Sequence, residues 1–212
     1  SVGNDDSTYV QRFVHAYETE VITIFDTETT WLDILHDDIV QIAAVQIKQG
    51  EMVPGSQFCV YIETHRTIPE MLGDVVNPMI EARRHQPLVA REKALQMFMD
   101  YAQGTTLLGH NTDYDVHILT ANLQRDLPHY TDLSLLDNYF DTLLLAKLLR
   151  PGLRQYKLKH LLEVLHLAGE NSHLADADVA ATRELTRYCY RKALDIVPQQ
   201  QHFLAQERVM AR

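Results

Sequence analysis

Two acidic residues that could hold a divalent cation, Asp26 and Glu28, end an apolar segment that predicts a strand. Residues 20–27 (EVITIFDT) are rich in β-branched residues and apolar on both faces, which is typical of a central strand. Because side chains two apart in a strand point the same way, both carboxylates should lie on one face at its carboxyl end. A hard cation would relieve their repulsion and desolvation, whereas the alternative is a solvated start of a loop.

The sequence GHNTDYD, which precedes a helix expected over 112–125, holds a second candidate. Asn111 or Thr112 should cap that helix. Helical spacing puts Asp113 on a polar face, where the helix dipole favours a first-turn acid, and puts Asp115 on an apolar face. A carboxylate that points toward the core needs a partner or a metal, so Asp115 is the candidate ligand.

The same test separates two aspartates at the start of a late helix, expected over 175–196. Asp176 lines up with arginines on a solvated face, whereas Asp178 lines up with the buried, mostly apolar face. His173 falls in the loop just before this helix, near enough to reach the same site. A histidine before a helix is more often a cap or a surface residue, so its interpretation depends on the neighbouring acids.

The remaining segments predict a mixed α/β sheet covered by helices. Strands are expected at 20–27, 38–47, 52–62, 105–109 and 138–141, and helices at 6–18, 69–103 with breaks at Pro78 and Pro87, 112–125, 142–149, 156–166, 175–196 and 199–210. Pro54 and Gly55 suggest that the third strand lies at an edge of the sheet.

The composition is that of an ordinary globular chain. Of 212 residues, 46% are hydrophobic and 23% are charged, and no apolar run is long enough to span a bilayer, so no membrane is expected. Cys59 and Cys189 suggest neither a disulfide framework nor a zinc site, and the acidic, polar N-terminus is unlike a signal peptide. A reducing, cytoplasmic location is therefore expected. The missing initial Met suggests an excerpt or a trimmed chain.

The net charge of −10 argues against a polyanionic partner, but its distribution weakens that objection. Residues 1–38 hold nine acids and one base, and bound metal could neutralise part of this excess. Between Asp141 and Glu163 the chain has no acid and five bases: Lys147, Arg150, Arg154, Lys157 and Lys159. With Tyr156 among them, they could form a track for a nucleic-acid backbone with a stacking ring, and the alternative is a solvated basic helix face.

Taken together, these segments resemble the DEDDh exonucleases, a family that includes the epsilon proofreading subunit of bacterial DNA polymerase III, ribonuclease T and oligoribonuclease. Asp-x-Glu ends the first strand, His-Asn-x-x-Tyr-Asp opens a middle helix, and His-x-Ala-x-x-Asp opens a late helix. The likeness runs from Val21 to Tyr190 and includes the pair Asp141-Thr142. This chain has Trp31 where the family usually has Gly, near the place where the family's terminal base stacks.

The resemblance implies a fold, a cofactor and a set of site residues. The family has an α/β, ribonuclease H-like three-layer fold, a mixed five-stranded sheet flanked by helices, and uses two divalent cations, Mg²⁺ or Mn²⁺. Carried over by position, Asp26, Glu28, Asp115 and Asp178 are implied to hold the metals, and His173 to act as general base. The implied substrate-binding residues are Thr29, Trp31, Leu32, His110, Asn111, Tyr156 and Lys157.

The expected activity is metal-dependent 3′–5′ exonuclease hydrolysis at the 3′ ends of single-stranded DNA or RNA, with release of nucleoside monophosphates. The alternatives are another two-metal nuclease or nucleotide hydrolase on the same fold, and a non-catalytic nucleic-acid-binding module. The expected parts are an acidic helical extension at 1–19, an exonuclease domain at 20–196 and a C-terminal helical tail at 197–212. A polymerase or another protein is a candidate partner. The sequence leaves open the choice between DNA and RNA and the oligomeric state.

Overall fold

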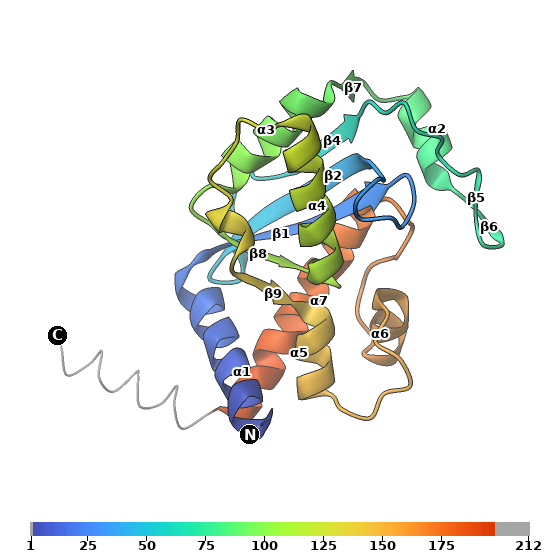
Figure 1. Cartoon of the computed structure of the whole chain (residues 1–212). Coiled ribbons are helices and arrows are strands. Elements are labelled where there is room, and N and C mark those ends of the chain that lie inside the picture. The colour runs from blue at the N-terminus through green and yellow to red at the C-terminus, as the bar shows by residue number, and fades with distance from the viewer. Residues whose placement is uncertain (1, 198–212) are drawn as a thin grey trace.

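The structure, a computed structural model, describes residues 2–197, with side chains from residue 7 onward (Figure 1). Its helices are α1 (Val2–Thr19), α2 (Pro78–Arg84), α3 (Arg91–Ala102), α4 (Thr112–Asp126), α5 (Thr142–Leu149), α6 (Leu158–Val164) and α7 (Ala175–Ile196), with one short 3-10 helix, η1 (Ser134–Leu136). Its strands are β1 (Val21–Thr29), β2 (Ile39–Lys48), β3 (Glu51–Met52), β4 (Phe58–Ile62), β5 (Met71–Leu72), β6 (Val75–Val76), β7 (Leu88–Val89), β8 (Thr106–Gly109) and β9 (Tyr139–Asp141). The helix expected at 199–210 lies outside the described residues. No helix within them is long and apolar enough to cross a membrane.

Strand β1 lies at the centre of a mixed sheet whose order is β7-β4-β2-β1-β8-β9, with β3 paired to β2. β2 runs antiparallel to β1 and β4, whereas β8 runs parallel to β1 and β9 parallel to β8. All five expected strands are present, so the predicted mixed α/β fold is confirmed, and the two-residue strands β3 and β7 add to the sheet. The edge expected at 52–62 is confirmed only in part, because β7 pairs with the last two residues of β4, Tyr61 and Ile62, and Pro54 and Gly55 fall in the turn before β4.

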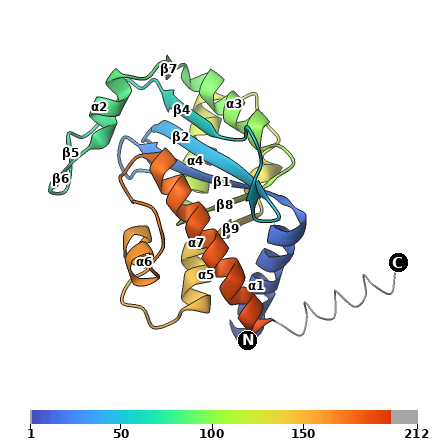
Figure 2. The same cartoon turned by 180° about the vertical axis from the view of Figure 1, so that it is seen from behind.

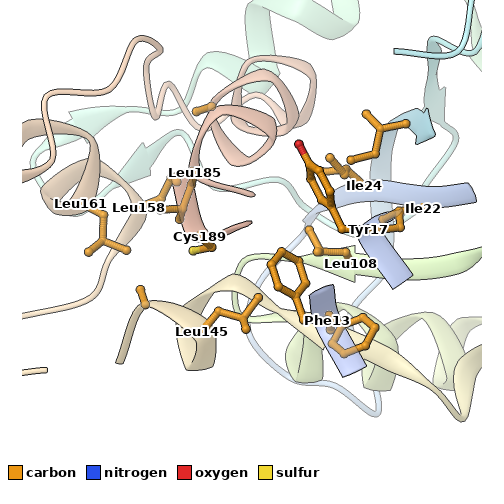
Figure 3. Packing of buried hydrophobic residues seen from close by; sticks show 14 of the residues in the cluster. Phe13, Tyr17, Ile22, Ile24, Leu108, Leu145, Leu158, Leu161, Leu185 and Cys189 are labelled. Atoms are coloured by element: carbon orange, nitrogen blue, oxygen red, sulfur yellow. The ribbon is translucent and has the colours of Figure 1, made fainter. Parts of the chain in front are cut away.

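Helices cover both faces of the sheet in three layers (Figures 1 and 2). Helices α1, α5, α6 and α7 pack on one face, and α3 and α4 pack on the other. Ile22 and Ile24 of β1 lie in the first core and Phe25 in the second, as the alternation of a strand requires. In Figure 3, Phe13 and Tyr17 of α1 pack in the same core as Ile22 and Ile24. Helix α1 is therefore part of the packed core, and the Phe13 side chain is fully buried.

Residues 69–76 form a hairpin instead of the expected helix. Strands β5 and β6 pair antiparallel around Gly73, whose φ of +64° a residue with a side chain rarely adopts. Pro78 then begins α2 instead of breaking a helix, because the first helical position needs no backbone N–H donor. Asn77 caps α2 by accepting from the Met79 N–H at 3.0 Å. The hairpin and α2 extend away from the sheet as an arm (Figures 1 and 2).

Candidate active site

Three carboxylates meet at the carboxyl end of β1. Asp26 and Glu28 project from one face of this strand and Asp178 from the first turn of α7, and one oxygen from each lies within 4.8 Å of the others. Asp26 Oδ2 is buried and accepts no hydrogen bond from the described residues. A buried carboxylate oxygen without a donor is unfavourable, and a divalent cation, which takes carboxylate oxygens as ligands, would satisfy it. The residues present therefore fit a metal site.

Asp115 approaches this group from α4, in the opposite layer of helices. Its side chain is 4% exposed, and the Thr27 hydroxyl donates to its Oδ1 at 2.5 Å. Asp113 in the same turn is exposed and accepts from the Tyr139 hydroxyl at 2.5 Å. The burial of the two aspartates thus differs as their helical faces predict, and Asp115 is the one that reaches the interior.

Burial raises the pKa of all four acids, because an ionised carboxylate is poorly stabilised away from water. For Asp26, burial and then the charges of Asp115 and Glu28 hold the pKa well above its ordinary range. For Glu28, burial and then the Asp178 charge have the same effect on the pKa. Burial also raises the pKa of Asp115 and that of Asp178 to about 7, against an ordinary 3.8. The four carboxylates would repel one another if all were ionised. A bound divalent cation would stabilise their ionised forms, because it supplies positive charge.

The turn before α4 is built differently from the cap that the sequence suggests. Asn111 takes a left-handed conformation, with a φ of +62°, and its side chain makes no capping hydrogen bond. The Thr112 hydroxyl lies 2.8 Å from the carbonyl oxygens of both Gly109 and Phe140. Asp141 holds the turn instead. Its Oδ1 accepts from the Asn111 N–H at 2.8 Å, and its side chain also caps α5. This aspartate therefore ties the turn to α5.

The loop at 165–174 brings Asn171 to the site, a residue that belongs to none of the sequence motifs. The Asn171 amide nitrogen, oriented to donate, lies 2.9 and 3.2 Å from the two carboxylate oxygens of Asp178. His173 is half-buried in the same loop with a φ of +60°, and no hydrogen bond within the described part of the chain joins its ring to the carboxylates. No sequence signal marks Asn171, because loop side chains have no periodicity and are placed by tertiary contacts.

A groove of about 590 Å³ is lined by two of the four carboxylates and by residues of α5 and of the segment before α6. Its lining includes Asp26, Asn171 and Asp178, together with Lys147, Tyr156 and Lys157 and with His110 and Asn111. A larger cavity, of about 710 Å³, lies at the other end of β8 against α1, and none of the four carboxylates lines it. The smaller groove is therefore the candidate substrate site.

His110 lies in the wall of this groove, but both of its ring nitrogens have protein partners. Nε2 lies 2.8 Å from the Tyr156 carbonyl oxygen, and Nδ1 lies 2.8 Å from Thr142 Oγ1. Nε2 carries a proton, since a carbonyl oxygen can only accept, and burial lowers the pKa of His110. His110 therefore holds the segment around Tyr156 against the turn before α4, and its ring nitrogens are already engaged.

The loop after β1 presents the other expected substrate-binding residues on the α4 side of the carboxylates. The Trp31 carbonyl oxygen accepts from the Thr29 hydroxyl at 2.7 Å and from the Tyr114 hydroxyl at 3.1 Å. The side chains of Trp31 and Leu32 are 51% and 65% exposed. The backbone of the loop is thus held in place while its apolar side chains face solvent, and neither of them lines the groove.

Comparison with known proteins places this site in a family. The RNase_T exonuclease family model matches residues 23–186. The PolC-type DNA polymerase III of Latilactobacillus sakei subsp. sakei (strain 23K) is 31% identical over 169 residues, which cover 78% of this chain and 11% of the polymerase. The PolC-type DNA polymerase III of Clostridium perfringens (strain 13 / Type A) is 30% identical over 169 residues, which cover 80% of this chain and 11% of the polymerase. The chain therefore corresponds to a small part of each of these polymerases.

Solved structures share the fold at lower identity. E. coli Exonuclease I in complex with a dT13 oligonucleotide matches with a TM-score of 0.65 and 20% identity, over 91% of this chain and 46% of that one. An ExoI/SSB-Ct complex matches with a TM-score of 0.65 and 20% identity, over 92% and 46%. Because the family model covers most of the chain and encloses all four carboxylates, this chain belongs to the DEDDh family of 3′–5′ exonucleases.

Proposed function

We propose that this chain removes nucleotides one at a time from the 3′ end of single-stranded DNA, with two divalent cations, Mg²⁺ or Mn²⁺, as cofactors. The observation that carries this proposal is the unpartnered Oδ2 of Asp26, which lies among further carboxylates at the end of β1. Phosphodiester hydrolysis needs an activated water and a stabilised leaving oxygen, and paired cations supply both when bound.

In this proposal Asp26, Glu28, Asp115 and Asp178 hold the cations. The Thr27 hydroxyl and the Asn171 amide orient the carboxylates of Asp115 and Asp178 by donating to them. His173 takes a proton from the attacking water, because a neutral imidazole is suited to act as a general base near neutral pH. Its assignment is supported by its loop, which also carries Asn171 to the site.

Single-stranded DNA is the proposed polymer. The exposed side chains of Trp31 and Leu32 suit stacking on a terminal base, whereas a paired end would first have to be unstacked. The relatives support DNA in preference to RNA, because PolC-type proteins are DNA polymerases and Exonuclease I binds a DNA oligonucleotide in its solved complex. On the same grounds a DNA polymerase is the protein partner that we propose.

The test uses substrates of one sequence: 5′-labelled linear single-stranded DNA, linear single-stranded RNA and blunt DNA duplex, and a circular single strand labelled at an internal position. Each is incubated with Mg²⁺ or with EDTA. The proposal expects a ladder that shortens from the 3′ end, fastest on linear single-stranded DNA, and no cleavage in EDTA. The matched pair Asp178→Asn and Asp176→Asn provides the control, because Asp176 is exposed on the same helical turn and should be dispensable.

Each alternative has its own result in this assay. Cuts within the circle, or equal cutting of the blunt duplex, would indicate a different two-metal nuclease. Binding of the strand without cleavage at any metal concentration would indicate a non-catalytic module. Faster shortening of RNA than of DNA would mean that RNA is the substrate and that the proposed reaction is otherwise correct.

A further inference from the structure

Only two of the five bases between β9 and the end of α6 lie on the wall of the groove. These two are Lys147 of α5 and Lys157, the residue before α6. Arg150 turns elsewhere and donates to the Tyr188 hydroxyl at 2.8 Å. Both lysines are exposed, and neither forms an ion pair within the part of the chain that the structure describes. The basic segment is therefore not a uniform solvated face, because two of its charges lie on the wall of the groove that Asp26 and Asp178 also line.

Lys147 is held beside the groove by Tyr156. Its Nζ lies 5.9 Å from the centroid of the tyrosine ring, within the range of a cation–π attraction. The ring is fixed in turn, because the Tyr156 hydroxyl donates to the Arg150 carbonyl at 2.8 Å and accepts from the Leu153 N–H at 3.1 Å. The Tyr156 carbonyl accepts from His110. One face of the Tyr156 ring, a candidate for base stacking, is thus occupied by the Lys147 ammonium. Tyr156 therefore positions the positive charge of Lys147.

The two flanks of the carboxylates differ in charge. On the α4 side, the loop after β1 exposes Trp31 and Leu32, whereas its charged groups are already paired, since Asp33 lies 2.7 Å from His36 and Asp37 lies 3.4 Å from Arg66. On the α5 and α6 side, the groove carries the two lysines. When the terminal linkage of a strand is cleaved from the 3′ end, every phosphate other than the scissile one lies on its 5′ side. The two lysines of the groove, which form no ion pair within the described residues, therefore favour a strand whose 5′ side lies along the groove.

We propose that Lys147 and Lys157 bind the phosphodiester next to the scissile one on its 5′ side, so that the strand leaves over α5 and α6. This inference rests on the proposed function and adds a subsite for the penultimate nucleotide. The lysines act by binding, since the carboxylates that line the same groove perform the chemistry. Their removal should therefore raise KM for a polymer and change kcat little.

The experiment combines variants of the chain with changes in the substrate. The substrates are a thymidine oligomer, the same oligomer with one neutral methylphosphonate at the linkage 5′ to the scissile one, and the p-nitrophenyl ester of thymidine 5′-monophosphate. The ester has a scissile phosphodiester and no further phosphate. The variants are Lys147→Ala, Lys157→Ala and their combination. Lys93→Ala, which removes an exposed lysine from α3 on the opposite face, is the control for net charge.

For the double variant, KM for the unmodified oligomer should rise about tenfold, and the slope of log KM against log salt should fall by about 0.7, because the two lysines neutralise one phosphate. For the wild type, KM for the methylphosphonate oligomer should be higher than KM for the unmodified oligomer by the same factor. The double variant should show little further increase in KM for the methylphosphonate oligomer. The loss on the ester should be far smaller, and Lys93→Ala should behave as the wild type does.

If the lysine substitutions raised KM equally for the unmodified and the methylphosphonate oligomers, the assignment would be overturned, because the lysines would then act at another phosphate. An equal loss on the ester would move them to the scissile phosphate and would also overturn it. A wild type that cleaves oligomer and ester, with lysine variants that match it, would refute this inference and leave the proposed function intact. A wild type that cleaves neither with Mg²⁺ or Mn²⁺ would refute the proposed function itself.

Discussion

Without bound cations, the protein should become less stable as the pH rises from about 4 to about 7. Burial raises the pKa of Asp115 and that of Asp178 to about 7, against the ordinary value of 3.8 that applies to an unfolded chain. Between these values the folded protein keeps protons that the unfolded chain has released. The resulting stability is fully present below the unfolded pKa and is lost as the pH rises through the folded pKa.

The size of this effect follows from the shift. The change from 3.8 to about 7 spans about three pH units at about 1.4 kcal/mol each, so one such carboxylate destabilises the folded protein by about 4 kcal/mol above pH 7. The side chains of Asp115 and Asp178 are only 4% and 8% exposed, so water screens their charges little. An asparagine at position 178 would also offer an amide donor toward Asp26, whose Oδ2 lacks one. Asp178→Asn should therefore raise the stability of the metal-free protein by about 2–4 kcal/mol near pH 8 and by almost nothing near pH 4.

The assay is urea unfolding in EDTA at a series of pH values, with the wild type and Asp178→Asn compared at each. The difference between the two proteins is the quantity to read, because burial lowers the pKa of His110, and this group contributes stability that rises with pH. Asp195→Asn, which changes an exposed residue of α7, should follow the wild type at every pH. Saturating Mg²⁺ should restore the stability of the wild type at high pH and help Asp178→Asn less.

A difference between wild type and Asp178→Asn that stays constant across this pH range would refute the reasoning. It would mean that the carboxylate is as well solvated in the folded protein as in the unfolded chain. A wild type that Mg²⁺ does not stabilise at any pH would separately contradict the fit of these carboxylates to a cation.

Three further outcomes are expected. In exonuclease assays with Mg²⁺, Asp178→Asn should lose nearly all activity. Asp176→Asn should stay within about tenfold of the wild type, since it loses only a helix-dipole contact of about 1 kcal/mol. The reverse ranking of the two variants would overturn the assignment. His173→Ala should lower the single-turnover rate about a hundredfold or more, because the attacking water loses its proton acceptor, and should leave Mn²⁺ affinity nearly intact, because the carboxylates hold the cations. Phe13→Ala should destabilise the protein by about 3–5 kcal/mol in urea unfolding because its ring is fully buried, whereas His15→Ala on the exposed side of α1 should change little; equal losses would contradict the packing of α1 in the core.

Local periodicity was sufficient to predict which acids face the interior. Strand alternation placed Asp26 and Glu28 on one face of β1, and helical spacing separated the buried Asp178 from the exposed Asp176. These assignments succeed because the direction of a side chain relative to its own helix or strand is determined by the local backbone geometry. The resemblance to a family then grouped segments that local geometry alone could not bring together.

Local patterns failed where the backbone depends on turns and distant partners. Residues 69–76 read as helical, yet a glycine in the left-handed region turns them into a hairpin. Asn111 and Thr112 read as helix caps, but the carboxylate of Asp141 organises their turn from thirty residues away. A competing hydrogen bond from a distant residue leaves no trace in the local sequence, so no local pattern could have predicted these two results.

Only the tertiary structure decided how the acids are brought together and what surrounds them. Thr27 donates to Asp115 across 88 residues of sequence, and Asn171 reaches Asp178 from a loop without periodicity. The tyrosine that holds Lys147 beside the groove is likewise fixed by His110, from another part of the chain. The raised pKa values of the carboxylic acids arise from burial, which depends on the packing of both helix layers against the sheet. The sequence by itself therefore determined the kinds of residue and their faces, whereas packing decided their distances, their solvation and hence their chemistry.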